Sequence, residues 1–203
     1  LLVRRLSARR PLNGIVARKR IVSRGDLPGS DGGVYNPGAV AGDGVIVLLA
    51  RREIDYRFSS VAHPELIVVD AQRLDVRSHR TLVRRGYPDG ARVEDFRLIR
   101  HEGHLLAVHT LVRADGRIRP MLSVVGERTL EPWDPLDLPI ETTPVEKNWV
   151  LFEVEGRLHC LYRLDPLTIF ARERGRWRLV KRVENGWSAD FRGVLSNSAN
   201  LVP

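Results

Sequence analysis

The sequence has few or none of the features that mark disulfide-rich, membrane-spanning or secreted proteins. It contains one cysteine, Cys160, so no intramolecular disulfide can form, and its place in an apolar strand makes it a poor nucleophile. No apolar run approaches the ~18 residues that a membrane helix needs, and no secretory signal is apparent. We therefore expect a reduced, cytoplasmic protein without a membrane partner, although a chain that begins with Leu1 leaves open a leader that has been removed.

The positive charge is also not concentrated anywhere. The formal net charge of +8 comes from arginines spread along the whole chain, without the Lys/Arg block or interleaved aromatics of a nucleic-acid groove. We expect no nucleic-acid partner, whereas anionic substrates remain open. His101 and His104 have no third ligand at metal spacing, so we interpret them as exposed turn residues and expect no metal centre.

The apolar pattern is typical of strands, and no stretch has a convincing helical period. Three candidate hairpins turn at Gly44, Gly103 and Gly156. The spacings between these glycines, 59 (103−44) and 53 (156−103), match sheets of about four strands. The sequence therefore predicts an all-β fold built as a radial repeat, a β-propeller, in which each sheet is one blade.

We expect one propeller domain over 1–203, with blades that start near residues 34, 93, 146 and 196. Later strands are predicted over 66–70, 118–125, 167–172 and 177–183. The chain would supply about three and a half blades. Because a closed ring needs at least four, we expect truncation at the C-terminus; closure by a partner chain or by a rearranged fourth blade is the alternative.

Polar residues recur at equivalent places in the three hairpins. The start of the first strand lies beside the end of the second strand in an antiparallel hairpin, so these residues should gather at one end of each blade. Three of them lie 8 residues before the turn glycine and three lie 7 residues after it: Asn36, Asp95 and Asn148, then Arg51, Thr110 and Arg163.

Asp95 is the strongest candidate for chemistry. Its neighbour Glu94 should point to the opposite face of the strand, so the two carboxylates could not serve one reaction as acid and base. An inverting glycosidase uses two carboxylates, one to give a proton and one to activate water. The alternative is structural: Asp95 caps a turn and pairs with Arg97.

Cations outnumber acids near this position. Arg51, Arg97, Lys147 and Arg163 would suit an anion such as phosphate, whose own charge could replace the missing base. For each cation separately, a surface ion pair is the competing explanation.

Five segments together resemble glycoside hydrolase family 130, the inverting β-mannoside phosphorylases and hydrolases, which are five-bladed propellers. The resemblance covers most of residues 34 to 203, and its most specific piece is the acidic motif followed by an arginine. Phe96 replaces the usual proline and Asn148 an aspartate of many phosphorylases, which indicates a divergent member. The matching segments are Asn36-Pro37-Gly38, Leu48-Leu49-Ala50-Arg51-Arg52-Glu53, Glu94-Asp95-Phe96-Arg97, Lys147-Asn148 with Leu151-Phe152, and Leu161-Tyr162-Arg163-Leu164-Asp165-Pro166.

The resemblance implies that Asp95 is the general acid and acts on the glycosidic oxygen through a sugar hydroxyl. Phosphate or water would attack the anomeric carbon from the opposite face. The resulting candidate ligands of phosphate are Arg97, Lys147 and Arg163; those of the sugar are Asn36, Arg51, Glu94, Asn148, Trp149 and Tyr162, with Trp149 chosen to stack on a sugar ring.

We thus expect an enzyme that cleaves β-mannosides or related oligosaccharides with inversion, by phosphorolysis in preference to hydrolysis. It would need no cofactor, only inorganic phosphate as a co-substrate. Two alternatives remain: a carbohydrate-binding propeller without catalysis, and a glycosidase or mannosyltransferase of different sugar specificity. The sequence leaves a homo-oligomer open.

Overall fold

The computed structural model describes residues 33–55, 59–141, 143–146, 148–184 and 186. These residues contain no helix, and therefore none that could cross a membrane. Their strands are β1 (Gly33–Gly42), β2 (Val45–Asp55), β3 (Ser59–Asp70), β4 (Val76–Thr81), β5 (Val83–Arg84), β6 (Arg92–His101), β7 (His104–Val112), β8 (Ile118–Val125), β9 (Thr129–Asp134), β10 (Val150–Val154), β11 (Arg157–Leu164), β12 (Leu167–Glu173) and β13 (Arg176–Val183).

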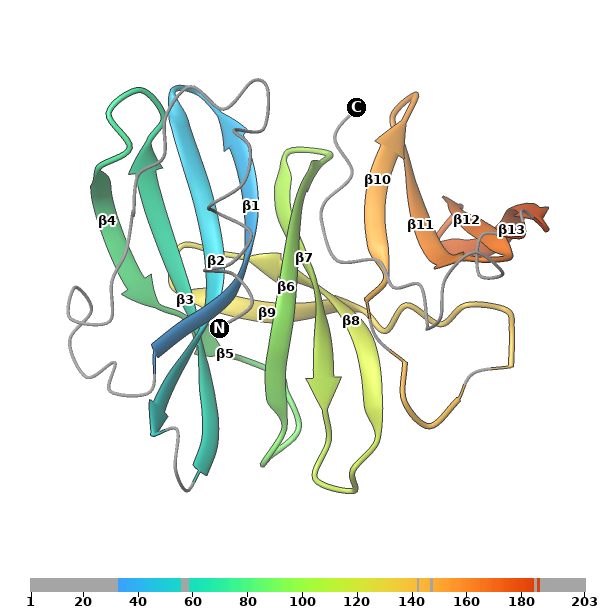
Figure 1. Cartoon of the computed structure of the whole chain (residues 1–203), viewed down its shortest axis with the longest axis horizontal. Helices are drawn as coiled ribbons and strands as arrows, with labels where there is room; N and C mark the ends of the chain where they lie inside the picture. The colour runs from blue at the N-terminus through green and yellow to red at the C-terminus, as the bar shows by residue number, and fades with distance from the viewer. Residues whose placement is uncertain (1–32, 56–58, 142, 147, 185, 187–203) are drawn as a thin grey trace, which may run out of the picture.

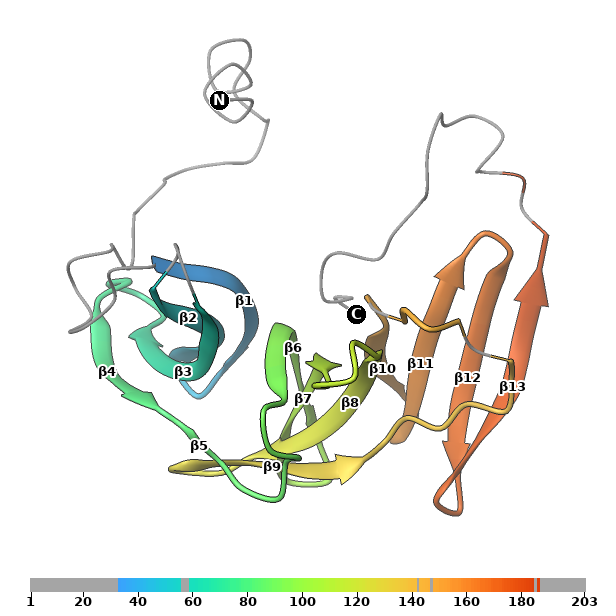
Figure 2. The same cartoon turned by 90° about the horizontal axis from the view of Figure 1, so that it is seen from below.

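The strands form three antiparallel meanders that follow one another along the chain (Figure 1). The first sheet has the order β1-β2-β3-β4, the second β5-β9-β8-β7-β6 and the third β10-β11-β12-β13. Strand β5 adds to the outer edge of the second sheet, parallel to β9. Figure 2 shows the three sheets arranged in an arc, with β1 packed against β6 and β6 against β10. The predicted all-β, propeller-type fold is confirmed.

The three predicted hairpins form with two-residue turns. Both turn residues have positive φ, which is the backbone geometry of a type I′ turn and explains the glycine at the second position. The φ pairs are 52° and 70° at Asp43-Gly44, 47° and 79° at Glu102-Gly103, and 51° and 72° at Glu155-Gly156.

The first strands of the first two sheets have an irregularity close to their starts. The register of β1 with β2 shifts between Tyr35 and Gly38, and that of β6 with β7 shifts between Glu94 and Arg97. Both shifts insert one extra residue into the first strand, as in a β-bulge, which re-aims the side chains at that point. The three repeat-equivalent residues have left-handed backbones: φ is 46° at Asn36, 57° at Asp95 and 65° at Asn148.

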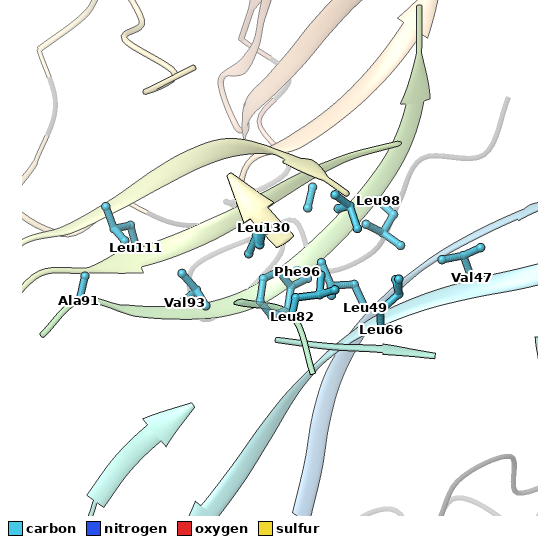
Figure 3. Packing of buried hydrophobic residues seen from close by; sticks show 12 residues of the cluster. Val47, Leu49, Leu66, Leu82, Ala91, Val93, Phe96, Leu98, Leu111 and Leu130 are labelled. Carbon is cyan, nitrogen blue, oxygen red and sulfur yellow. The ribbon is translucent and has the colours of Figure 1, made fainter. Parts of the chain in front are cut away.

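Apolar side chains fill the space between consecutive sheets. In Figure 3, Leu49 and Leu66 of the first sheet lie opposite Phe96 and Leu98 of the second, and all four are buried. A second cluster joins Leu106, Val108 and Leu122 of the second sheet to residues of the third. The third sheet and the residue just before it contribute Trp149, Leu151, Leu158, Cys160, Phe170 and Trp177.

Gly38 lets the first two blades approach each other at their inner strands. A Cβ atom at this position would lie 2.8 Å from both the Cα atom of Arg97 and the carbonyl oxygen of Phe96. Real Cβ atoms do not come so close to a backbone, so only glycine permits this packing of β1 on β6. This contact brings the bulge of β1 beside the bulge of β6.

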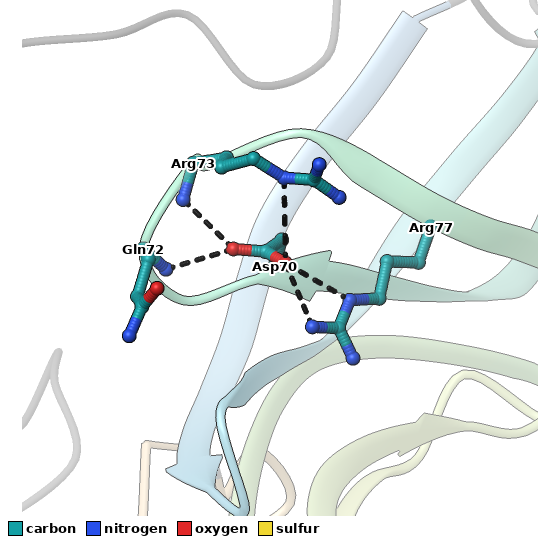
Figure 4. A network of polar contacts seen from close by, with 4 residues as sticks. All are labelled: Asp70, Gln72, Arg73 and Arg77. Carbon is teal, nitrogen blue, oxygen red and sulfur yellow. Dashed lines mark hydrogen bonds and ion pairs between the residues drawn. The ribbon is translucent and has the colours of Figure 1, made fainter.

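A carboxylate closes the connection between β3 and β4. Oδ1 of Asp70 accepts hydrogen bonds from the main-chain N–H groups of Gln72 (2.9 Å) and Arg73 (2.8 Å), and Oδ2 accepts from Nη2 of Arg77 at 2.7 Å (Figure 4). The N–H group of Arg73 and the Arg77 side chain hold the pKa of Asp70 well below its usual value. The loop thereby gains a fixed shape.

His101 is not an exposed turn residue: it is 7% exposed, and its Nδ1 lies 2.7 Å from Oε2 of Glu153 in β10. This expectation was wrong because the third sheet covers the side chain of His101, whereas His104 is exposed. The fourth blade predicted to start near residue 196 lies outside the described residues.

Candidate active site

A pocket opens where the bulged starts of the inner strands meet. Its volume is about 210 Å³. The residues that line it come from all three blades: Asn36 and Pro37 from β1, Asp95, Phe96 and Arg97 from β6, and Asn148 just before β10. Three of these residues are the repeat-equivalent positions identified in the sequence, so the structure brings Asn36, Asp95 and Asn148 together.

Asp95 is the only carboxylate among the described residues that line the pocket. The Nδ2 atom of Asn36 donates a hydrogen bond of 2.6 Å to Oδ1 of Asp95, which links the first blade to the second. The left-handed backbone at Asp95 is tolerated because a short polar side chain can bond locally. Non-glycine residues held in this conformation are often found at functional sites.

Arg97 continues the same line of contacts to the third blade. Its Nη1 atom donates to the main-chain oxygen of Asp95 at 3.1 Å, and its Nη2 atom donates to Oδ1 of Asn148 at 3.0 Å. The residue is 8% exposed. Burial lowers the pKa of Arg97, and the charge of Asp95 opposes that shift, but a guanidinium stays protonated in either case. The pocket therefore contains one acid beside one fixed cation.

The second carboxylate, Glu94, lies beside the pocket in an ion pair. Its Oε2 is 3.0 Å from Nη1 of Arg51, and Nε of Arg51 is 3.2 Å from Oε1 of Glu53. Glu94 does not line the pocket, so the expectation that Glu94 and Asp95 do not serve one reaction as acid and base stays a prediction. Because Asp95 belongs to the bulge, strand alternation fails there, and both carboxylates contact side chains of the first blade.

Several predicted ligands do not line the pocket. Trp149 is 3% exposed and packs edge-on against Tyr162, with ring centroids 5.3 Å apart, so it offers no open face for the sugar that we expected it to stack on. Tyr162 bonds Oε1 of Glu146 at 3.3 Å, and Arg163 is exposed with its guanidinium over the Tyr162 ring. Lys147 lies outside the described residues.

The sequence did not identify Phe96 as a pocket residue or His109 as the residue that it packs on. Phe96 lines the pocket and packs on the buried ring of His109, with ring centroids 5.6 Å apart. Nε2 of His109 is 3.0 Å from the hydroxyl of Tyr87 and 2.9 Å from that of Ser123. Burial lowers the pKa of His109 to about 4 and raises that of Tyr87. Phe96 therefore packs on a neutral His109 ring that is hydrogen-bonded to Tyr87 and Ser123.

The described residues offer no group of three or more His, Cys, Asp or Glu side chains that could hold a metal ion. Cys160 is buried in β11, and burial raises the pKa of its thiol. It is therefore not an activated nucleophile. The polar side chains that line the pocket are those of Asp95, Arg97, Asn36 and Asn148.

No protein-family model matches the sequence, and no curated protein is significantly similar to it. Solved structures do match in fold. The sucrose-6-phosphate hydrolase of Lactobacillus gasseri superposes with a TM-score of 0.59 at 12% identity, over 77% of this chain and 36% of its own. A glycosyl hydrolase from Bacteroides ovatus gives 0.51 at 12% identity, over 74% and 49%.

A proposed glycoside hydrolase from Parabacteroides distasonis gives a TM-score of 0.53 at 14% identity, over 72% of this chain and 50% of its own. The chain thus spans half or less of the length of these three structures. At such low identity the likeness defines the fold: an arrangement of β-sheet blades shared with glycoside hydrolases. It does not single out the family that the sequence motifs resemble.

Proposed function

We propose that this protein cleaves glycosidic bonds with inversion and that Asp95 is the general acid. The proposal is supported chiefly by one observation: a lone carboxylate lies beside a buried guanidinium in a pocket formed by three blades. The fold shared with glycoside hydrolases is the second support. A pocket of about 210 Å³ has room for a single sugar ring or a smaller group.

The finer proposal is phosphorolysis of β-mannosides, with an oligosaccharide and inorganic phosphate as the two substrates. Asp95 gives its proton to the glycosidic oxygen, directly or through a sugar hydroxyl, as the bond from that oxygen to the anomeric carbon breaks. A phosphate oxygen bonds to the anomeric carbon from the opposite face. The products are mannose 1-phosphate and the remaining sugar with a free hydroxyl. Phosphate brings its own negative charge, so this route needs no second carboxylate.

Arg97 is the residue that would bind the phosphate in this scheme. A guanidinium pairs with phosphate oxygens through parallel hydrogen bonds, and its burial strengthens the attraction. Arg51 pairs with Glu94 as well as with Glu53 and so offsets part of their negative charge. The sugar would bond the amides of Asn36 and Asn148.

The test is incubation of the protein with mannobiose or mannosyl-glucose, with and without phosphate. We expect mannose 1-phosphate only when phosphate is present. Asp95→Asn should lower the rate at least ~100-fold, because a general acid is removed. Asp89→Asn, at an exposed loop residue, is the matched control and should be neutral. Free mannose without mannose 1-phosphate would exclude phosphorolysis, and no cleavage of any β-glycoside would exclude the enzyme.

A carbohydrate-binding propeller without catalysis is the second candidate. It is favoured by the amides of Asn36 and Asn148, which occupy the two positions equivalent to Asp95 and do not titrate. This candidate requires that Asp95→Asn leaves sugar affinity unchanged and that no turnover is detected with any glycoside. Calorimetric titration of sugars into both proteins, beside the rate assay, separates it from the enzyme.

A further inference from the structure

Among the described residues, Asn148 alone represents the third blade in the lining of the pocket. It does not belong to a strand but to the connection 135–149, which joins β9 to β10. Arg97 bonds the side chain of Asn148 from the pocket side. Because a residue outside a sheet is placed by the contacts of its own segment, the contacts that fix this connection decide where Asn148 lies.

The main chain of the connection pairs with β8 shortly before Asn148. The N–H group of Glu146 donates to the main-chain oxygen of Ile118 at 3.0 Å, and the N–H group of Ile118 donates to the oxygen of Pro144 at 3.3 Å. The two bonds belong to a parallel bridge between Ile118 and Val145. The second blade thus holds the connection as far as Glu146, two residues before Asn148.

The side chain of Glu146 is buried and bonds to both sides of this point. Its Oε1 atom accepts hydrogen bonds from the main-chain N–H of Thr143 at 2.8 Å, from the Thr143 hydroxyl at 3.0 Å and from the Tyr162 hydroxyl at 3.3 Å. Burial and the nearby Glu146 raise the pKa of Tyr162, so this hydroxyl keeps the proton that it donates. One oxygen atom therefore closes the loop of the connection and ties it to β11.

We infer that Glu146 is a positioning residue of the pocket: its carboxyl group fixes the connection so that Asn148 meets Arg97 and the sugar. The inference also gives a role to Tyr162, which was predicted to bind the sugar but does not line the pocket. Tyr162 acts through Glu146 instead. The inference rests on the proposed function, in which the amide of Asn148 bonds the sugar.

A double-mutant cycle between Glu146 and Asn148 tests the inference. Asn148→Gly, which suits the φ of 65°, should weaken mannobiose binding about 3- to 10-fold, the worth of one hydrogen bond. Glu146→Ala should weaken it by a similar factor in the wild type but by less than about 2-fold in Asn148→Gly, because the residue that it positions is gone. Calorimetry measures the affinity, and kcat/KM for release of mannose 1-phosphate should follow it. A merely structural role would give the same factor in both backgrounds.

Two further variants serve as controls. Glu146→Gln keeps an oxygen that can accept the same three hydrogen bonds, so its affinity should lie within about 2-fold of the wild type. Glu141→Ala removes an exposed acid from the same connection and should keep both affinity and rate.

Tyr162→Phe tests the inference if Glu146→Ala does not fold, which the thermal unfolding midpoint reports. It removes one of the three donors to Glu146 and leaves the ring in place. We expect mannobiose binding to weaken about 2- to 3-fold, and only in the background that retains Asn148.

The outcomes separate the inference from the proposed function. If the wild type forms mannose 1-phosphate while Glu146→Ala has no effect, or the same effect with and without Asn148, the inference is overturned and the proposed function stands. If the wild type binds mannobiose without turnover, the proposed enzyme fails, and the cycle measured on affinity still decides the inference. If the wild type neither binds nor cleaves a glycoside, both fail. Non-additive losses in an active protein support both.

Discussion

The side chain of Asn36 in the first blade holds that of Asp95 in the second, with 2.6 Å between Nδ2 and Oδ1. Both residues have left-handed backbones and lie in bulges of neighbouring inner strands. The orientation of the acid therefore depends on a residue that lies 59 positions earlier in the sequence. Contacts of this kind place a carboxylate within the small tolerance that proton transfer requires.

We expect Asn36→Gly to lower kcat for glycoside cleavage about 10-fold, because the carboxylate of Asp95 loses its fixed orientation. Glycine accepts the φ of 46°, so no backbone strain is added. Stability should fall by about 1 kcal/mol or less, since the bond is exposed. Ala41→Gly, at an exposed position of the same strand, is the control for the added chain entropy and should keep kcat. Equal kcat values for the two variants would remove Asn36 from the site.

Gly38→Ala tests whether the close approach of the first two blades shapes the pocket. The added methyl group would meet backbone atoms of Phe96 and Arg97 at 2.8 Å, which cannot move aside like the end of a side chain. We expect a loss of about 1 to 3 kcal/mol in the free energy of unfolding, measured with urea, and a loss of glycoside cleavage.

The matched control is Gly42→Ala in the same strand. There the nearest heavy atom is Nε of the Arg100 side chain at 3.5 Å, which is an ordinary contact. This variant should retain both stability and cleavage. A Gly38→Ala protein as stable and active as Gly42→Ala would show that β1 and β6 can separate without harm to the pocket.

The hairpins were predictable because their signals are local. A glycine between two runs of strand formers specifies a two-residue turn. Asn36, Asp95 and Asn148 each lie 8 residues before the turn glycine of their hairpin, which puts them at equivalent places. Because the three residues are equivalent in the repeat, they could be expected to lie close together. The bulge at Asp95 was not predictable, since its neighbours Glu94 and Phe96 have no glycine to mark it.

Interactions between blades were the part that the sequence could not reveal. The partner of Glu94 is Arg51 in another sheet, and Trp149 is buried because Tyr162 and the second blade's apolar residues pack on it. A tryptophan beside a polar motif has the same sequence pattern whether it faces solvent or the core. His101 was misjudged for the same reason, because its partner Glu153 belongs to the next blade.

Asp70→Ala should destabilise the protein, because two main-chain N–H groups and Arg77 lose their acceptor. The folded-state pKa of Asp70 lies below the value of 3.8, so its contribution is present above pH 3.8 and is lost as the pH falls further. Urea unfolding at pH 7 measures the loss. Arg73→Ala is the control: this side chain is 73% exposed and 3.6 Å from the carboxylate, so its removal should cost under about 0.5 kcal/mol.

The buried His109 should make the protein sensitive to moderate acid. Its pKa in the folded state is about 4, against 6.5 for the exposed residue, because burial opposes the charged ring. The unfolded chain therefore takes up a proton first as the pH falls. Stability should be unaffected above pH 6.5, decline between pH 6.5 and about 4, and change no further through this group below pH 4; the full loss is on the order of 3 kcal/mol.

His109→Gln tests this assignment because glutamine can still bond Tyr87 or Ser123 but does not titrate. The variant should be less stable than the wild type at pH 7 and should lose less stability between pH 7 and 4.5, as measured by urea unfolding at each pH. His104→Gln removes an exposed histidine at the start of the same strand and should keep the wild-type slope. The acid effect of Asp70 begins only below pH 3.8 and does not overlap this window. If His109→Gln and the wild type lose stability in parallel, the buried ring is not the group that titrates.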